Sequence, residues 1–186
     1  GDVYKRQVVS TYQAVSGAGK EGIEELQNQV KEYAEGKEMT ANLLPTGSAP
    51  KHFPIAFNLL PQIDVFLEND YTKEEMKMVN ETHKILHDDT IQVVPTTVRV
   101  PVYRSHSESV LVETEEPVSV EAFRKACAAF PGLQVKDNPA EQEYPMPLYT
   151  PNQNDCEIGR IRKDLYNDKG MNFCCLLYTS DAADDG

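Results

Sequence analysis

The segment that most constrains the fold of this chain is residues 97–109, TVRVPVYRSHSES. Valine occupies every second position around Arg99 and Pro101, and this period predicts a strand with one apolar face and with Arg99 on the other. Proline cannot donate to a sheet ladder, so the strand is expected to end or bend near Pro101. His106 lies seven residues after Arg99, and the two side chains converge only if the strand bends. From the residue types alone, an edge strand with a solvated arginine and a surface histidine is the simpler interpretation.

Three segments carry the apolar spacing and end signals of helices. Residues 20–35 repeat apolar side chains at helical intervals and are followed by glycine, a typical helix stop. Thr72 and Glu75 match a capping box in front of an apolar stripe that continues to Leu86. A third helix is expected after a serine cap and before a Pro-Gly pair, over residues 119–130.

Short strand-like segments come in runs between these helices. They are residues 55–60, 63–67, 91–103, 108–114, 133–136 and 157–163. Runs of strands with a few long helices between them are typical of α+β domains. The chain is therefore expected to form a mixed, largely antiparallel sheet with helices packed on one face.

The composition restricts the classes of partner. The chain has 186 residues, a formal net charge of −12 and no basic run, which argues against a nucleic acid or an anionic membrane as partner. No apolar run approaches the roughly 18–20 residues of a membrane span. Its few cysteines do not form a disulfide framework, so a cytoplasmic location is expected.

Histidine and cysteine positions bear on catalysis and metal binding. No group of histidine, cysteine and carboxylate residues has metal-ligand spacing, so no metal is expected. A histidine such as His106 suits proton transfer at neutral pH. His52, His83 and His87 are rivals in principle. His83 lies on the apolar helix stripe and His87 near the end of that helix, both ordinary structural placements.

Five blocks of the chain, in one order, resemble aspartate-β-semialdehyde dehydrogenases. They are VVSTYQAVSGAG at Val8 to Gly19, KHFPIAFNLLPQIDVF at Lys51 to Phe66, YTKEEMKMVNETHKIL at Tyr71 to Leu86, VRVPVYRSHSES at Val98 to Ser109 and GRIRKD at Gly159 to Asp164. The resemblance extends from about Val8 to Phe173. It implies a C-terminal catalytic and dimerisation domain like that of glyceraldehyde-3-phosphate dehydrogenase, in a homodimer or homotetramer.

The resemblance also implies roles for three residues near the ends of the predicted strands. Arg99 would bind the substrate carboxylate, His106 would be the acid–base group, and Gln13 would orient the acyl intermediate. The planar guanidinium group of arginine donates two parallel hydrogen bonds to a carboxylate, which suits the first role. Without the resemblance, Gln13 reads as a loop amide.

Four further residues receive ligand-binding roles from the resemblance. Glu74 would bind the substrate amino group and Lys77 the phosphate; by themselves they are ordinary neighbours on the first turns of a helix. Ser16 and Gly17 belong to the SGAG turn, which lies beside the nicotinamide of NADP in similar proteins. Glycine there allows the backbone to approach a ligand closely.

The resemblance implies a reaction and leaves alternatives open. The parent protein would reduce aspartyl phosphate to aspartate semialdehyde with release of phosphate, a step of lysine, threonine and methionine synthesis, using NADP bound mainly by an N-terminal domain. The first alternative is an N-acetyl-glutamyl-phosphate reductase-like enzyme, which the motifs fit less well. The second is a non-catalytic dimerisation and substrate-binding module. An in-frame dinucleotide motif upstream would separate the enzyme from the module.

Both ends of the chain are expected to be foreign to this domain. Residues 1–7, GDVYKRQ, and 175–186, CLLYTSDAADDG, resemble translated sequencing adapters, which leaves 8–174 as a truncated domain. The family's nucleophilic cysteine belongs to a motif upstream of the glutamine block. Cys127, on an apolar helix face, and Cys156, among acidic residues, do not suit that role. The fragment is therefore expected to be inactive alone.

Overall fold

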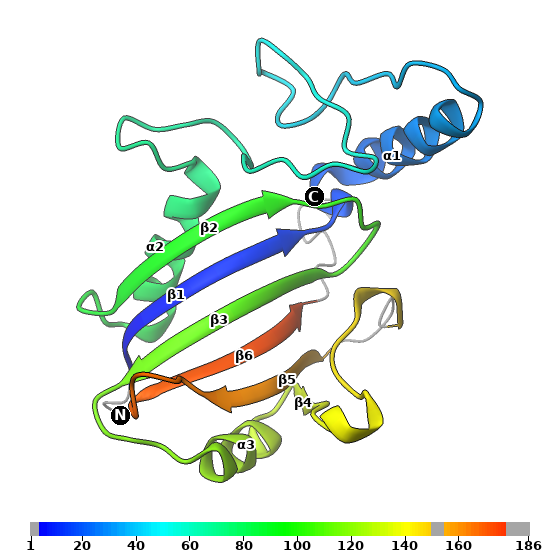
Figure 1. Ribbon diagram of the computed structural model, residues 1–186. Helices are drawn as coiled ribbons and strands as arrows, with labels where there is room; N and C mark the ends of the chain where they lie inside the picture. Colours follow the sequence, from blue (N-terminus) through cyan, green and yellow to red (C-terminus); the bar gives the residue numbers. More distant parts are fainter. Residues whose placement is uncertain (1–3, 150–154, 178–186) are drawn as a thin grey trace.

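The computed structural model describes residues 4–149 and 155–177, in which a six-stranded sheet is combined with three α-helices (Figure 1). The strands are β1 (Tyr4–Gln13), β2 (Gln92–Arg99), β3 (His106–Thr114), β4 (Leu133–Val135), β5 (Cys156–Lys163) and β6 (Gly170–Leu177). Their order in the sheet is β2-β1-β3-β6-β5-β4. The pairs β1–β2 and β4–β5 are parallel and the other three pairs are antiparallel. The predicted mixed, largely antiparallel sheet is confirmed.

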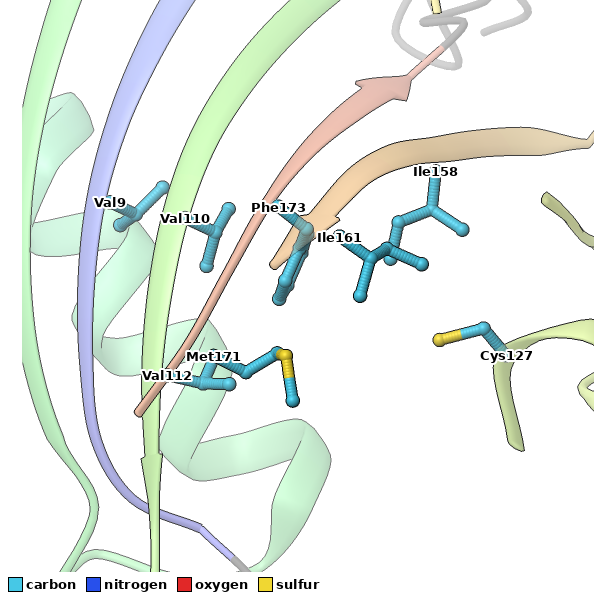
Figure 2. Close-up of a cluster of buried hydrophobic side chains, with 8 residues drawn as sticks. All are labelled: Val9, Val110, Val112, Cys127, Ile158, Ile161, Met171 and Phe173. Atoms are coloured by element: carbon cyan, nitrogen blue, oxygen red, sulfur yellow. The ribbon is translucent and has the colours of Figure 1, made fainter. Parts of the chain in front are cut away.

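One face of the sheet carries the main hydrophobic core (Figure 2). Val9, Val110 and Phe173 come from neighbouring strands, and they pack with Cys127 of α3 (Val120–Ala129). Helix α2 (Lys73–Leu86) adds Met78 to the same cluster. Two of the three helices therefore cover one face, as the alternation of apolar residues in the strands requires.

Helix α1 (Gly19–Ala34) departs from the expected single helix layer. It lies beyond the end of β1 with the loop that follows it (Figure 1), and Leu26 packs with Leu44 and Ile55 in a second cluster. Within that cluster Gln29 is completely buried. Its side-chain oxygen accepts hydrogen bonds from the backbone N–H groups of Ile55 and Ala56, at 2.9 and 3.0 Å. The Gln29 side chain thus supplies the hydrogen-bond acceptor that a neighbouring strand would otherwise provide for these two N–H groups.

The strands expected at residues 55–60 and 63–67 are absent, and that prediction was wrong. Both segments belong to a loop with isolated bridges from Leu60 to Arg99 and from Phe66 to Thr72. Phe57 and Asp64 have positive φ angles of 60° and 66°. Left-handed residues break the period of two, so the apolar residues of this loop do not form a pleated strand.

The sheet extends past the expected limits of the domain. Residues 4–7 are part of β1, where Arg6 and Gln7 pair with Gln92 and Val93 of β2. Residues 175–177 complete β6, and Leu176 is buried. Residues 1–3 and 178–186 lie outside the described part of the chain. An adapter-like origin of the two ends stays a prediction.

The two outer strands of the sheet are β2 and β4. Strand β2 contains Pro95, paired with Val9 of β1, and β4 is three residues long. Proline is tolerated here because an outer strand has a neighbour on one side only.

Candidate active site

The parallel strands β1 and β2 end side by side, and most of the predicted site residues lie at this end of the sheet. Gln13 and Arg99 are register partners. Beyond them the two segments stay together, since the backbone N–H of Val15 donates to the carbonyl of Val102 at 2.8 Å. Strand β3 begins with His106 on the other side of β1. The bend after Arg99 therefore brings Arg99 and His106 to the same end of β1.

Arg99 is buried, in contrast to the solvated arginine of the simpler interpretation. Only 4% of the residue is exposed, and it lies on the sheet face that α2 covers. Its Nη1 donates to the backbone carbonyl of Ala14 at 2.8 Å. The backbone N–H of Ala14 in turn donates to Nδ1 of His106 at 3.1 Å. Ala14 thus joins the two predicted functional side chains.

Gly17 lies against the same two side chains. A Cβ atom added at Gly17 would stand 2.8 Å from Nη1 of Arg99 and 3.2 Å from Nε2 of His106. These distances are shorter than ordinary van der Waals contacts, so a side chain here would displace one group or both. The absent side chain keeps a gap open beside the guanidinium and the imidazole. The adjacent Ser16 is buried.

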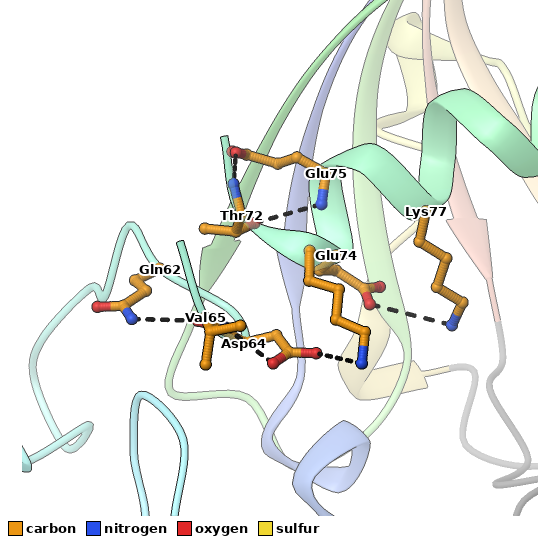
Figure 3. Close-up of polar contacts among 8 residues, drawn as sticks. Gln62, Asp64, Val65, Thr72, Glu74, Glu75 and Lys77 are labelled. Carbon is orange, nitrogen blue, oxygen red and sulfur yellow. Dashed lines mark hydrogen bonds and ion pairs between the residues drawn. The ribbon is translucent and has the colours of Figure 1, made fainter. Parts of the chain in front are cut away.

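Helix α2 places Glu74 at the site through a fixed N-terminus (Figure 3). Thr72 and Glu75 form the predicted capping box, and the second Glu75 oxygen accepts from the backbone N–H of Thr97 in β2 at 3.0 Å. The side chain of Gln13 donates to Oε1 of Glu74 at 3.3 Å. The second carboxylate oxygen of Glu74, Oε2, is 3.9 Å from Nζ of Lys77. The expected neighbours Glu74 and Lys77 do interact, although the Lys77 side chain is 57% exposed.

A pocket of about 340 Å³ opens at this end of the sheet. Gly17, Glu74 and Arg99, three of the seven predicted residues, line it together with loop residues 43–47 and 63–64. The pocket therefore brings a guanidinium and a carboxylate to one concave surface. A ligand with both a negative and a positive group would be complementary to it.

Burial changes the acid–base properties of the site. Burial lowers the pKa of Arg99 to about 10, an effect that the nearby Glu74 carboxylate opposes. Burial and then the charge of Arg99 lower the pKa of His106 from 6.5 to about 4. At neutral pH the site therefore contains a cationic guanidinium beside a neutral imidazole.

Several buried side-chain polar atoms have no hydrogen-bond partner within the described part of the chain. They include Nε of Arg99 and the hydroxyl oxygens of Ser16 and Ser105. A buried donor without a partner costs about 1–3 kcal/mol. The Arg99 guanidinium therefore keeps a buried donor that no described residue satisfies.

Sequence reasoning missed two parts of this site. Ala14 contributes only backbone groups, so its side chain gives no signal. The pocket wall from residues 43–47 lies in a segment with no regular spacing. Within the described residues, no group of three or more histidine, cysteine or acidic residues is arranged to hold a metal. No helix in that part of the chain is long and apolar enough to cross a membrane.

Comparison with known families and structures shows the family of this chain. The family model "Semialdehyde dehydrogenase, dimerisation domain" matches residues 2–177. The chain belongs to the semialdehyde dehydrogenase family and contains its dimerisation domain.

Curated aspartate-semialdehyde dehydrogenases are among the relatives of this chain. The chain is 52% identical to that of Aquifex aeolicus over 167 residues, and 46% identical to that of Bacillus subtilis over 165 residues. These matches cover 90% and 88% of the chain, but 47% and 48% of the relatives. A solved structure, aspartate semialdehyde dehydrogenase II of Vibrio cholerae complexed with ASA, is 38% identical with a TM-score of 0.85; the match covers 94% of this chain and 49% of that one. The chain thus spans about half the length of the relatives it matches.

Proposed function

We propose that this chain is the substrate-binding and dimerisation half of an NADP-dependent aspartate-semialdehyde dehydrogenase. The complete enzyme would reduce aspartyl phosphate to aspartate semialdehyde and release phosphate, for amino-acid biosynthesis. The observation that carries this proposal is the buried guanidinium of Arg99, which lines the same pocket as the Glu74 carboxylate. An α-amino acid presents one carboxylate and one ammonium group, which are complementary to these two side chains.

Each predicted residue has a role that its position supports. Arg99 binds the α-carboxylate, and Glu74 binds the ammonium group. Lys77, three residues further along α2 and exposed, binds the phosphate. Gln13, hydrogen-bonded to Glu74, orients the acyl group. His106, next to Arg99, is the group that exchanges a proton during the reaction.

The carboxylate of Glu74 favours this substrate over the N-acetylated one of the alternative enzyme. An N-acetyl group carries no positive charge, so it could not form an ion pair with the Glu74 carboxylate. The complete enzyme is therefore expected to discriminate strongly against N-acetylated substrates. Comparable rates with N-acetyl-glutamyl phosphate would favour the alternative.

The complete enzyme would use NADP, whose nicotinamide supplies the hydride when bound. Gly17 is exposed and lacks a side chain, and the hydroxyl of the adjacent Ser16 has no partner among the described residues. These two residues would therefore border the nicotinamide, while most of the cofactor would be bound by the other half of the enzyme.

The nucleophile of the reaction is proposed to lie outside this chain. Burial raises the pKa of both Cys127 and Cys156, and for Cys156 the charges of Glu108 and Asp155 add to the effect. A raised pKa disfavours the thiolate that nucleophilic catalysis needs. The chain alone is therefore expected to be inactive.

The test of the substrate role is Arg99→Lys in the complete enzyme. Lysine keeps the charge but loses the planar fork, and a charge-assisted hydrogen bond contributes about 1.5–3 kcal/mol. We expect kcat/KM to fall roughly 10- to 150-fold, mainly through KM. Arg104→Lys, at an exposed arginine five residues further on, is the matched control. Near-normal kcat/KM for Arg99→Lys would contradict the proposed role.

The proton-transfer role is tested by His106→Asn in the same enzyme. We expect kcat to fall about 100-fold or more while KM changes little. His87→Asn is the control, because His87 is exposed and its positive φ of 53° is well tolerated by asparagine. If both variants lose activity equally, or neither does, His106 has no special role in catalysis.

A homodimer or homotetramer is proposed for the complete protein. The matched family model is a dimerisation domain. On the sheet face opposite the main core, Val8 and Leu111 are half-buried and Tyr12 is 42% exposed, which would suit contact with a second copy. Tyr12→Arg should lower the proportion of dimer in sedimentation analysis. Tyr166→Arg, at a residue 97% exposed outside the sheet, should not.

A further inference from the structure

Both backbone groups of Ala14 are bonded to functional side chains. Its N–H donates to Nδ1 of His106 at 3.1 Å, and its carbonyl accepts from Nη1 of Arg99 at 2.8 Å. The residue is completely buried. No water competes for these groups at such a position, so the two hydrogen bonds are strong constraints on the side chains.

The backbone around Ala14 is itself held in place. The carbonyl of the preceding Gln13 accepts from the N–H of Val100 at 3.0 Å, and the N–H of the following Val15 donates to Val102 at 2.8 Å. Ala14 is thus fixed on both sides by the segment that follows β2. Its N–H cannot turn away from the imidazole without breaking these bonds.

The direction of the hydrogen bond determines which ring nitrogen of His106 carries the proton. A backbone N–H can only donate, so Nδ1 must offer its lone pair. In the neutral imidazole the single proton is then on Nε2. The opposite tautomer would place two hydrogen atoms against each other between Ala14 and the ring.

Nε2 is the ring nitrogen that faces the site. A Cβ atom at Gly17 would stand 3.2 Å from it, so Nε2 borders the gap that this glycine leaves open beside Arg99. In this tautomer the gap is bordered by N–H donors from both the imidazole and the guanidinium. Such a pair is suited to an oxygen atom that carries or develops negative charge.

We infer that Ala14 is a positioning residue whose backbone N–H fixes neutral His106 as the Nε2–H tautomer, so that His106 meets the substrate as a hydrogen-bond donor. The ring accepts a proton at Nε2 only after it has given up its contact with Ala14. The part of this inference that concerns the substrate rests on the proposed function; the tautomer does not.

The experiment is heteronuclear NMR of the folded 186-residue chain at neutral pH, correlating the carbon-bound ring protons with the ring nitrogens. The His106→Asn variant assigns the signals of His106. We expect a protonated Nε2 and an unprotonated Nδ1, without averaging between tautomers. Exposed His87 serves as the internal control and should show the averaged shifts of a ring in water. Averaged shifts for His106, or a protonated Nδ1, would overturn the inference.

Ala14→Pro provides a second, independent measurement. The φ of Ala14 is −64°, which proline adopts, and proline has no N–H. We expect His106 to lose its single tautomer and show averaged shifts. Retention of the pure Nε2–H form in a folded variant would show that Ala14 is not the cause. If the variant does not fold, the spectrum of the unchanged chain still decides. Neither measurement uses substrate, so a failure of the proposed function leaves both results interpretable.

Discussion

Acidification should destabilise this domain in a way that depends on one histidine. The pKa of His106 is lowered from 6.5 to about 4 by burial and by Arg99. The unfolded chain therefore binds a proton at this residue below about pH 6.5, whereas the folded chain does so only near about pH 4. Stability contributed by the neutral ring is complete above this window and is lost as the pH falls through it. The difference corresponds to about 3 kcal/mol.

A partly buried carboxyl group of β3 acts in the opposite direction. Burial raises the pKa of Glu108 from 4.5 to about 6. The folded chain binds this proton first, so the domain gains up to about 2 kcal/mol as the pH falls through that range. Together, His106 and Glu108 should lower the free energy of unfolding by about 1 kcal/mol between about pH 7 and about pH 4.

Single variants separate these two contributions. Unfolding free energies from urea denaturation should be measured across this pH range for the unchanged chain, His106→Gln and Glu108→Gln. Relative to the unchanged chain, His106→Gln should gain stability on acidification, and Glu108→Gln should lose it more steeply. His87→Gln, at an exposed residue, should run parallel. The reasoning is refuted if the His106→Gln curve is also parallel to that of the unchanged chain.

Three other substitutions test the packing of the site and of its supporting loop. Gln29→Leu leaves two buried backbone N–H groups of the loop without their acceptor, and should cost about 2–5 kcal/mol in urea denaturation; a smaller loss would show that the loop finds other partners. Ser105→Gly relieves a buried residue with a φ of 71° and should raise stability by about 1 kcal/mol, so an unchanged unfolding midpoint would argue against strain there. Gly17→Ala places a Cβ 2.8 Å from the guanidinium of Arg99 and should raise KM of the complete enzyme several-fold. Gly132→Ala, outside the pocket and with no atom within 4 Å of the added Cβ, should leave KM unchanged.

The elements that the sequence predicted well are those with local signals. Helix α2 begins after the capping box at Thr72, as expected, because both partners of that box lie within one turn. Helix α3 likewise begins after Ser119, whose side chain accepts from the N–H of Ala122. The strands around Arg99 were also found, since their alternation is local. Strand β2 ends at Arg99, however, before the proline that was expected to end it.

The failures share a different cause, which is partners distant in sequence. Residues 55–60 are apolar enough for a strand, but the side chain of Gln29 accepts from the N–H groups of Ile55 and Ala56, and no local pattern shows this. Strand β6 was not predicted. The burial of Arg99 was also not evident from the residue types, because its partner is a backbone carbonyl 85 residues away. The sequence predicted that Arg99 and His106 lie together only through the family resemblance and the expected bend of the strand near Pro101.

The margins of the sheet bear on how this chain behaves in concentrated solution. An outer strand with a continuous row of free N–H and C=O groups is a template for the strands of other molecules, and it promotes fibrous self-assembly. Here one margin contains Pro95, which removes a donor from the row, and the other margin is only three residues long. Neither offers a long regular template. The outer strands therefore resist open-ended polymerisation, which leaves the sheet face as the surface for closed association.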